Sequence, residues 1–220
     1  MMRIYFRYIV YLVVSIGFSA VNAGSYDDFF LAIQRDDAGA VRGLLTRGFD
    51  PNTVNPKGVH GLVVALQVPA PKVIAALLEI PATQAEVRTV NDESPLMLAA
   101  LKGYLEVCQQ LIARGADVNK PGWTPLHYAA TGGHLAIMRL LLDNHAYIDA
   151  ASPNGSTPLM MAARYGTRDA VQLLADAGAD PTVKNAVGLT AIDFALQVQR
   201  DDVVAVIAKA VQKFVGKGSW

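Results

Sequence analysis

The sequence of 220 residues contains one cysteine, Cys108, and has no surplus of either charge, with 19 basic against 19 acidic residues. A single cysteine excludes an internal disulfide, so bridges do not hold this fold together. The charge balance predicts no polycationic surface for nucleic acid. Charged residues form 17% of the chain and hydrophobic residues 52%, the reverse of what disordered segments show. We therefore expect a folded protein with a sizeable hydrophobic core.

The sequence also lacks the motifs of the common enzyme and cofactor classes. It contains no GxSxG segment, no Walker-type phosphate loop and no dinucleotide-binding glycine pattern. Nothing in the sequence places an activating base beside Cys108, so no nucleophile is expected. The histidines show none of the close spacings that metal ligands require; they are His60, His127, His134 and His145. These absences predict a protein that is not an enzyme and that holds no cofactor or metal.

The first 23 residues differ from the rest of the chain. Arg3 and Arg7 precede an apolar run over residues 8–20, and small residues end the segment at Ala23. This order is typical of a secretory signal peptide, and we predict cleavage after Ala23, which would leave residues 24–220. The alternative is an uncleaved membrane anchor. The run is shorter than the ~20 apolar residues of a spanning helix unless it is extended back past Arg7.

A short motif recurs through the remainder of the chain with a constant period. The segment TPLHYAA begins at Thr124 and returns as TPLMMAA at Thr157, 33 residues later. A Gly-Ala-Asp segment follows 21 residues after the start of a copy, as at Gly115 and Gly178. The copies begin near residues 27, 60, 94, 124, 157 and 190. A fixed period of this length predicts an array of small repeats.

The 33-residue period, the TPLH segment, a glycine before a second helix and the closing Gly-Ala-Asp together resemble the ankyrin repeat. The likeness covers about residues 26–210. It implies an all-α repeat solenoid, in which helix–turn–helix units stack and β-hairpin fingers join them. About six units, caps included, would form one domain over residues 24–220. Such units bury their apolar faces against one another, because no single unit can bury its own.

Local chemistry agrees with this assignment. The hydroxyl of Thr124 suits the N-cap of a first helix, and Pro125 suits the first helical position, where no N–H is needed. The resemblance implies that the ring of His127 hydrogen-bonds within and between repeats, linking Thr124 to neighbouring backbone. Asn154 and Gly155 form a turn dipeptide, because glycine accepts a positive φ, and we expect them at the tip of a β-finger.

The second helices carry two further expectations. Cys108 occupies a position that is Met138, Val171 or Val204 in other copies, so we expect a buried small hydrophobe. Residues 203–214 continue the last unit as an amphipathic helix.

The constant phase of the repeats also projects a binding surface. In ankyrin-like stacks the partner lies across the fingers and the exposed side of the first helices. The residues before each cap and after each Ala-Ala pair give a partner-binding set: Glu93, Leu101, Lys102, Trp123, Arg164, Tyr165 and Leu189. The same projection adds Thr131, Ser156, Gln197 and Val198.

Trp123, Arg164 and Tyr165 are expected at the centre of this surface, because Trp, Tyr and Arg dominate interface hot spots. The alternative for Trp123 is structural packing on a shortened finger beside Pro121. A neighbouring row is expected in the core: Leu98, Tyr128, Met161 and Phe194.

The resemblance therefore implies a non-enzymatic scaffold that binds a protein partner. With its signal segment, the chain resembles the small exported ankyrin-repeat proteins of bacteria, which predicts a periplasmic or secreted monomer that contacts neither nucleic acid nor, after cleavage, a membrane. The alternative is a membrane-tethered structural organiser that keeps the N-terminal segment as an anchor. The finger over residues 80–93 lacks the Gly-Ala-Asp segment and is either an irregular loop or a specialised contact.

Overall fold

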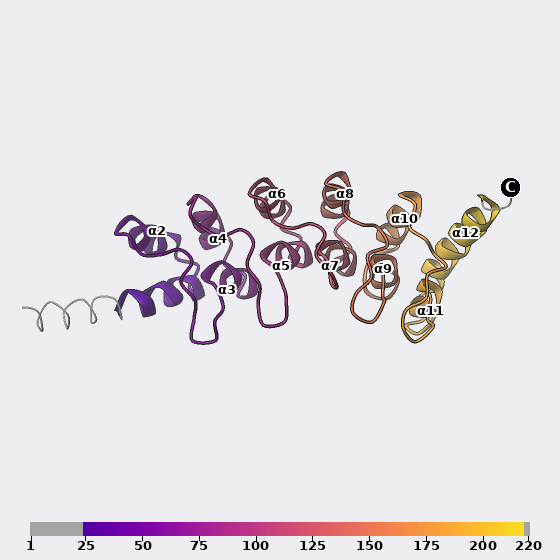
Figure 1. Ribbon diagram of the computed structural model, residues 1–220, viewed down its shortest axis with the longest axis horizontal. Coiled ribbons are helices and arrows are strands. Elements are labelled where there is room, and N and C mark those ends of the chain that lie inside the picture. The colour runs from indigo at the N-terminus through magenta and orange to yellow at the C-terminus, as the bar shows by residue number, and fades with distance from the viewer. Residues whose placement is uncertain (1–23, 218–220) are drawn as a thin grey trace, which may run out of the picture. The chain divides into compact units, whose positions relative to one another are not determined.

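The computed structural model describes residues 24–217 (Figure 1). The apolar N-terminal segment and its expected cleavage site at Ala23 lie outside the described residues. The chain divides into two compact units, with the border between Gln84 and Ala85, inside the irregular finger over residues 80–93. Within the described residues all regular secondary structure is helical. The predicted all-α fold is confirmed.

The first unit consists of two helix pairs. Phe29 and Ile33 of the first helix are fully buried. A Cβ added to Gly61 would lie 2.6 Å from the ring of Phe29, so glycine permits this close approach. The helices span residues 24–34, Ala38–Thr46 (α2), Gly61–Gln67 (α3) and Pro71–Leu78 (α4).

The second unit consists of four helix pairs in two layers. The first helices of the pairs pack side by side, and the second helices form the other layer (Figure 1). The first layer contains Pro95–Lys102 (α5), Pro125–Gly132 (α7), Pro158–Tyr165 (α9) and Ala191–Leu196 (α11). The second layer contains Leu105–Ala113 (α6), Leu135–Asp143 (α8), Arg168–Asp176 (α10) and Asp201–Lys217 (α12).

The recurring motif sets where the first helices begin. The hydroxyl of Thr157 accepts a hydrogen bond from the N–H of Met160 at 3.4 Å, and Pro158 is the first helical residue. Thr190 caps α11 in the same way, with Asp193 bonding back to the Thr190 N–H at 2.7 Å. The caps satisfy helix N–H groups that would otherwise lack acceptors, and this explains why the motif marks each start.

The fingers between the helix pairs are closed by turns. In one, the Ser152 N–H donates to the Ser156 carbonyl at 3.0 Å, and Gly155 takes the positive φ of 76°. Within the described residues no finger contains a strand, and the single bridge joins Val54 and His60. The fingers are therefore loops closed by turns and not the β-hairpins expected from the sequence.

Polar side chains at the base of the fingers connect successive repeats. Asn119 accepts from the Tyr147 N–H at 2.8 Å and donates to the His145 carbonyl at 2.7 Å. Asp149 accepts from the Asp180 N–H at 3.1 Å one repeat later. Equivalent contacts to the backbone of the next finger are made by Asn52 within the first unit and by Glu86 within the second. These contacts fix the spacing of the fingers.

Candidate binding surface

An apolar hollow of about 220 Å³ lies over α7 in the second unit. The ring of Trp123 meets the ring of His127 edge to face, with centroids 5.2 Å apart. The lining residues are Leu101, Trp123, His127, Tyr128, Thr131 and Met161. The hollow therefore brings together two of the predicted partner-binding residues, Leu101 and Trp123, with the projected Thr131.

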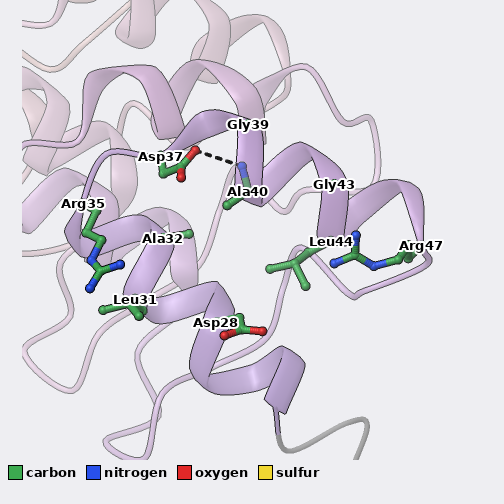
Figure 2. A pocket seen from close by; sticks show the side chains of 10 residues that line it. All are labelled: Asp28, Leu31, Ala32, Arg35, Asp37, Gly39, Ala40, Gly43, Leu44 and Arg47. Atoms are coloured by element: carbon green, nitrogen blue, oxygen red, sulfur yellow. Dashed lines mark hydrogen bonds between the residues drawn. The ribbon is translucent and has the colours of Figure 1, made fainter.

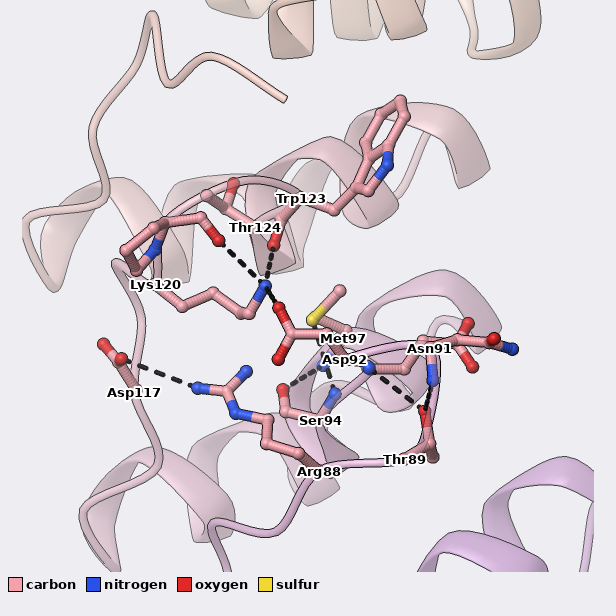
Figure 3. Close-up of polar contacts among 12 residues, drawn as sticks. Arg88, Thr89, Asn91, Asp92, Ser94, Met97, Asp117, Lys120, Trp123 and Thr124 are labelled. Atoms are coloured by element: carbon pink, nitrogen blue, oxygen red, sulfur yellow. Dashed lines mark hydrogen bonds and ion pairs between the residues drawn. The ribbon is translucent and has the colours of Figure 1, made fainter. Parts of the chain in front are cut away.

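The backbone of Trp123 is held by a buried ammonium group (Figure 3). Lys120, whose side chain is 5% exposed, donates to the carbonyls of Pro121 at 2.9 Å and Trp123 at 3.2 Å, and it forms an ion pair with Asp92. This finger is three residues shorter than the one that follows it. Lys120 replaces the backbone closure of the longer fingers, while the indole extends away from these polar contacts. The indole of Trp123 lines the hollow and contacts the His127 ring, while its backbone carbonyl accepts from Lys120.

Further charged contacts join the same two fingers. Arg88 lies 2.7 Å from Glu86 and 3.6 Å from Asp117, as Figure 3 shows for the second pair. The hydrogen bond from Lys120 holds the pKa of Asp92 below its usual value. Glu86, Asp92 and Asp117 are therefore each paired with a basic side chain of the protein.

His127 links two repeats. Its Nδ1 accepts from the Thr124 N–H at 3.1 Å and lies 2.9 Å from the Thr124 hydroxyl, while Nε2 lies 2.9 Å from the Ser156 carbonyl. A carbonyl only accepts, so Nε2 carries the proton. Burial lowers the pKa of His127 to about 4, which keeps the ring neutral. The structural role that the resemblance implied for His127 is confirmed.

Two residues expected in the core contribute to the hollow. Tyr128 and Met161 are only half-buried and line it, whereas Leu98 and Phe194 of the same row are buried. The Tyr128 hydroxyl donates to Glu93 at 3.2 Å, and burial, together with the charge of Glu93, raises the pKa of Tyr128 to about 12. Tyr128 and Met161, in the middle of this row, therefore belong to the surface. Leu98 and Phe194, at its ends, lie in the core as expected.

Other predicted residues are not among those that line the hollow. Arg164 donates to the Gln197 side chain and lies over the Tyr165 ring, 5.4 Å from its centroid. Tyr165 is 57% exposed, Lys102 is exposed and Leu189 is half-buried; none of them lines the hollow. Ser156, which the repeat phase placed on the surface, is buried, because its carbonyl turns toward His127.

A second hollow, of about 340 Å³, lies in the first unit between its first helix and α2 (Figure 2). Gly43 lines it where the inner copies carry Gln110, Leu140 and Leu173. The full lining is Asp28, Leu31, Ala32, Arg35, Asp37, Gly39, Ala40, Gly43, Leu44 and Arg47. The small residues of α2 leave this space open, and no pattern in the sequence indicated it.

Neither nucleophilic nor metal chemistry emerges from the described part of the chain. Cys108 is fully buried, as expected, and burial raises the pKa of its thiol to about 12, so the thiolate is suppressed. Across residues 24–217 no three His, Cys, Asp or Glu side chains gather as metal ligands would. Over the same residues no helix has the length and apolar character to cross a membrane.

Capped helix pairs in two layers, linked finger to finger, define a helical repeat solenoid with an apolar hollow on its surface. The family model for ankyrin repeats in three copies matches residues 29–121, 114–185 and 152–214. The chain belongs to the ankyrin repeat family, and ankyrin repeats are typical of protein-interaction scaffolds.

Several animal proteins share this similarity. The nuclear factor NF-kappa-B p105 subunit of Gallus gallus is 32% identical over 162 residues, 70% of this chain and 16% of that protein. The B-cell lymphoma 3 protein homolog of Mus musculus is 31% identical over 152 residues, 66% of this chain and 34% of that protein. The neurogenic locus notch homolog protein 1 of Xenopus tropicalis is 34% identical over 122 residues, 54% of this chain and 5% of that protein. The aligned part of the chain thus spans 34% or less of the length of each of these relatives.

Proposed function

We propose that this protein is a non-enzymatic scaffold that binds a segment of a partner protein in the hollow over α7. The observation that carries the proposal is the apolar lining itself, with Trp123 and Tyr128 half-buried around an open space. Water-accessible apolar hollows with aromatic walls are favourable binding sites, because burying such side chains releases much of the binding free energy. The family membership supports the same role.

The wider surface extends the proposal along both neighbouring repeats. Arg164 and Tyr165 follow Met161 on α9, and Lys102 follows Leu101 on α5, so a bound segment that leaves the hollow meets them. The partner-binding set therefore remains Glu93, Leu101, Lys102, Trp123, Arg164, Tyr165 and Leu189. We further propose that the six helix pairs of the described residues are six repeat units and that the protein is a monomer without nucleic-acid partners.

The N-terminal segment supports export as part of the proposal. Arg3, Arg7 and the apolar run before Ala23 fit a signal peptide, so we place the mature protein in a periplasm or outside the cell. The alternative function is a membrane-tethered organiser that retains the segment. N-terminal sequencing of the purified protein decides between them: Gly24 as the first residue supports export, whereas an intact Met1 or Met2 supports the anchor.

Affinity capture from a native extract tests the binding role. The full chain and its Trp123→Ala/Met161→Ala variant serve as baits, and a Glu106→Ala/Gln109→Ala variant on the exposed side of α6 is the matched control. We expect a partner that the wild type and the control hold and that the hollow variant loses while remaining folded by circular dichroism. Retention of every partner by the folded hollow variant would contradict the proposal. An Arg164→Ala/Tyr165→Ala bait then shows whether the contact reaches α9.

A further inference from the structure

Two cations beside the hollow have no carboxylate partner within the described residues. Lys102 ends α5 directly after the lining residue Leu101, and its side chain is exposed without an ion pair. Arg164 lies one turn after the lining residue Met161 on α9, so both project from the same helix face. The Nε of Arg164 is buried and has no hydrogen-bond partner among the residues described. Arg164 is half-buried and also donates to the Gln197 side chain, so neither cation is neutralised by an acidic group of the described residues.

The acidic groups of the neighbouring fingers already have hydrogen-bond or ion-pair partners within the protein. Asp92 pairs with Lys120, and Glu93 accepts from Tyr128. Glu86 and Asp117 lie beside Arg88, and Asp149 accepts from the Asp180 N–H.

The acidic and basic residues also lie at opposite ends of the first helices. Glu93 immediately precedes the N-cap of α5, whereas Lys102 is the last residue of that helix and Arg164 stands near the end of α9. Positive charge without a carboxylate partner therefore lies at the carboxyl ends of α5 and α9, next to Leu101 and one turn from Met161 of the hollow.

Resting on the proposed function, we infer that the hollow binds a peptide segment in which an apolar side chain is accompanied by an acidic residue. The apolar side chain packs against Trp123 and Tyr128, and the carboxylate pairs with Lys102 or Arg164. Arginine and lysine form short charge-assisted hydrogen bonds with carboxylates. A basic residue at this position would instead meet like charge, so the two cations also select against basic segments.

Selection from a random displayed peptide library tests the inference with the full chain. Peptides enriched on the wild type but not on Trp123→Ala are sequenced, and their Asp and Glu content is compared with that of the unselected library. We expect enrichment of an apolar residue with Asp or Glu nearby. The Lys102→Glu/Arg164→Glu variant should bind these peptides at least about tenfold more weakly. That variant should itself select Lys- and Arg-containing peptides.

A Lys72→Glu/Arg168→Glu variant reverses two exposed cations elsewhere and should leave the selected peptides unchanged. Trp123-dependent peptides without an acidic bias, or with affinity unaffected by reversal of Lys102 and Arg164, would overturn the inference and leave the proposed function standing. If no enriched peptide depends on Trp123, both fail.

Discussion

Lys120 and Asp92 form an ion pair that joins two successive fingers of the second unit. The two side chains differ in burial, since Lys120 is 5% exposed and Asp92 is 63% exposed. The Lys120 ammonium also binds the carbonyls of Pro121 and Trp123, so it has three acceptors around it. The carboxylate is therefore one part of a site whose main task is to close the short finger that precedes α7.

Replacing Lys120 with methionine should destabilise the protein. The side chain keeps its length, but two carbonyls of the finger lose a charged donor, and hydrogen bonds to charged groups contribute about 1.5–3 kcal/mol each. We expect a lower midpoint in urea unfolding and a smaller decrease for Asp92→Asn, because Asp92 is 63% exposed and water screens its charge. Lys72→Met, at an exposed site, should leave the midpoint unchanged. An unaltered midpoint for Lys120→Met would show that the finger does not depend on the ammonium.

The free energy of unfolding should decrease as the pH is lowered, because His127 titrates. Burial lowers the pKa of His127 to about 4 in the folded state, against about 6.5 in an unfolded chain. The unfolded state thus binds the proton first, so the stabilisation is complete above about pH 6.5 and is lost as pH falls toward 4. At about 1.4 kcal/mol per pKa unit the loss is about 3 kcal/mol. Urea unfolding at several pH values between 4 and 7 measures it.

The chain itself offers the control for this titration. Met160 stands at the position of His127 in the next repeat, and its sulfur lies 3.4 Å from the Thr157 N–H. His127→Met should therefore keep the helix start while removing the titration and the bond to Ser156. A wild-type free energy of unfolding that is flat from pH 7 to 4, or a slope that persists in His127→Met, would assign the pH dependence elsewhere.

Sequence patterns predicted the fold because its main signals are local. The bonds that start the first helices, such as Thr157 to Met160, span three residues, and the period places every copy in register. The roles of Cys108 and His127 followed from the same register. A residue that occupies the same position in several copies has the same structural role in each. Comparing the copies is therefore enough to predict that role.

The ion pair of Lys120 and the hollow could not be predicted in this way, because both arise where the chain departs from the repeat. Lys120 lies in the finger that is three residues short, and its partner Asp92 is 28 residues away at a positive φ of 60°, so no copy provides a template for the pair. The hollow arises where Thr131 leaves room beside Tyr128 and Met161, which depends on side-chain size across three helices. Periodicity gives the position of a residue, but it does not give the space left by its neighbours.

Cys108 should be inert in the folded protein. The side chain is fully buried, and burial raises the pKa of the thiol to about 12, so almost no thiolate is present at pH 8. We expect no reaction with a thiol reagent at pH 8 and one equivalent after unfolding in guanidinium. Cys108→Ser should cost about 1–3 kcal/mol by burying a hydroxyl, and more than Cys108→Ala. Rapid labelling of the native protein would contradict the buried position.

Two glycines should respond to alanine in opposite directions. Gly43 lies inside α2, where an added Cβ would meet only the flexible end of Arg47 at 3.5 Å. Alanine removes the conformational cost of glycine within a helix, so Gly43→Ala should stabilise by about 0.5–1 kcal/mol. At Gly166 the Cβ would lie 2.3 Å from the carbonyl oxygen of Ala130.

Because Gly166 has a φ of −78°, alanine fits its backbone, and the effect there comes from packing alone. The added methyl must push α7 and α9 apart, so Gly166→Ala should destabilise by about 1–3 kcal/mol. Urea unfolding of the two variants and the double variant measures both effects. The sites lie in different compact units, so the changes should add. Equal or greater stability of Gly166→Ala would show that α7 and α9 can separate at no cost, and that the close packing of the first layer does not hold the hollow in shape.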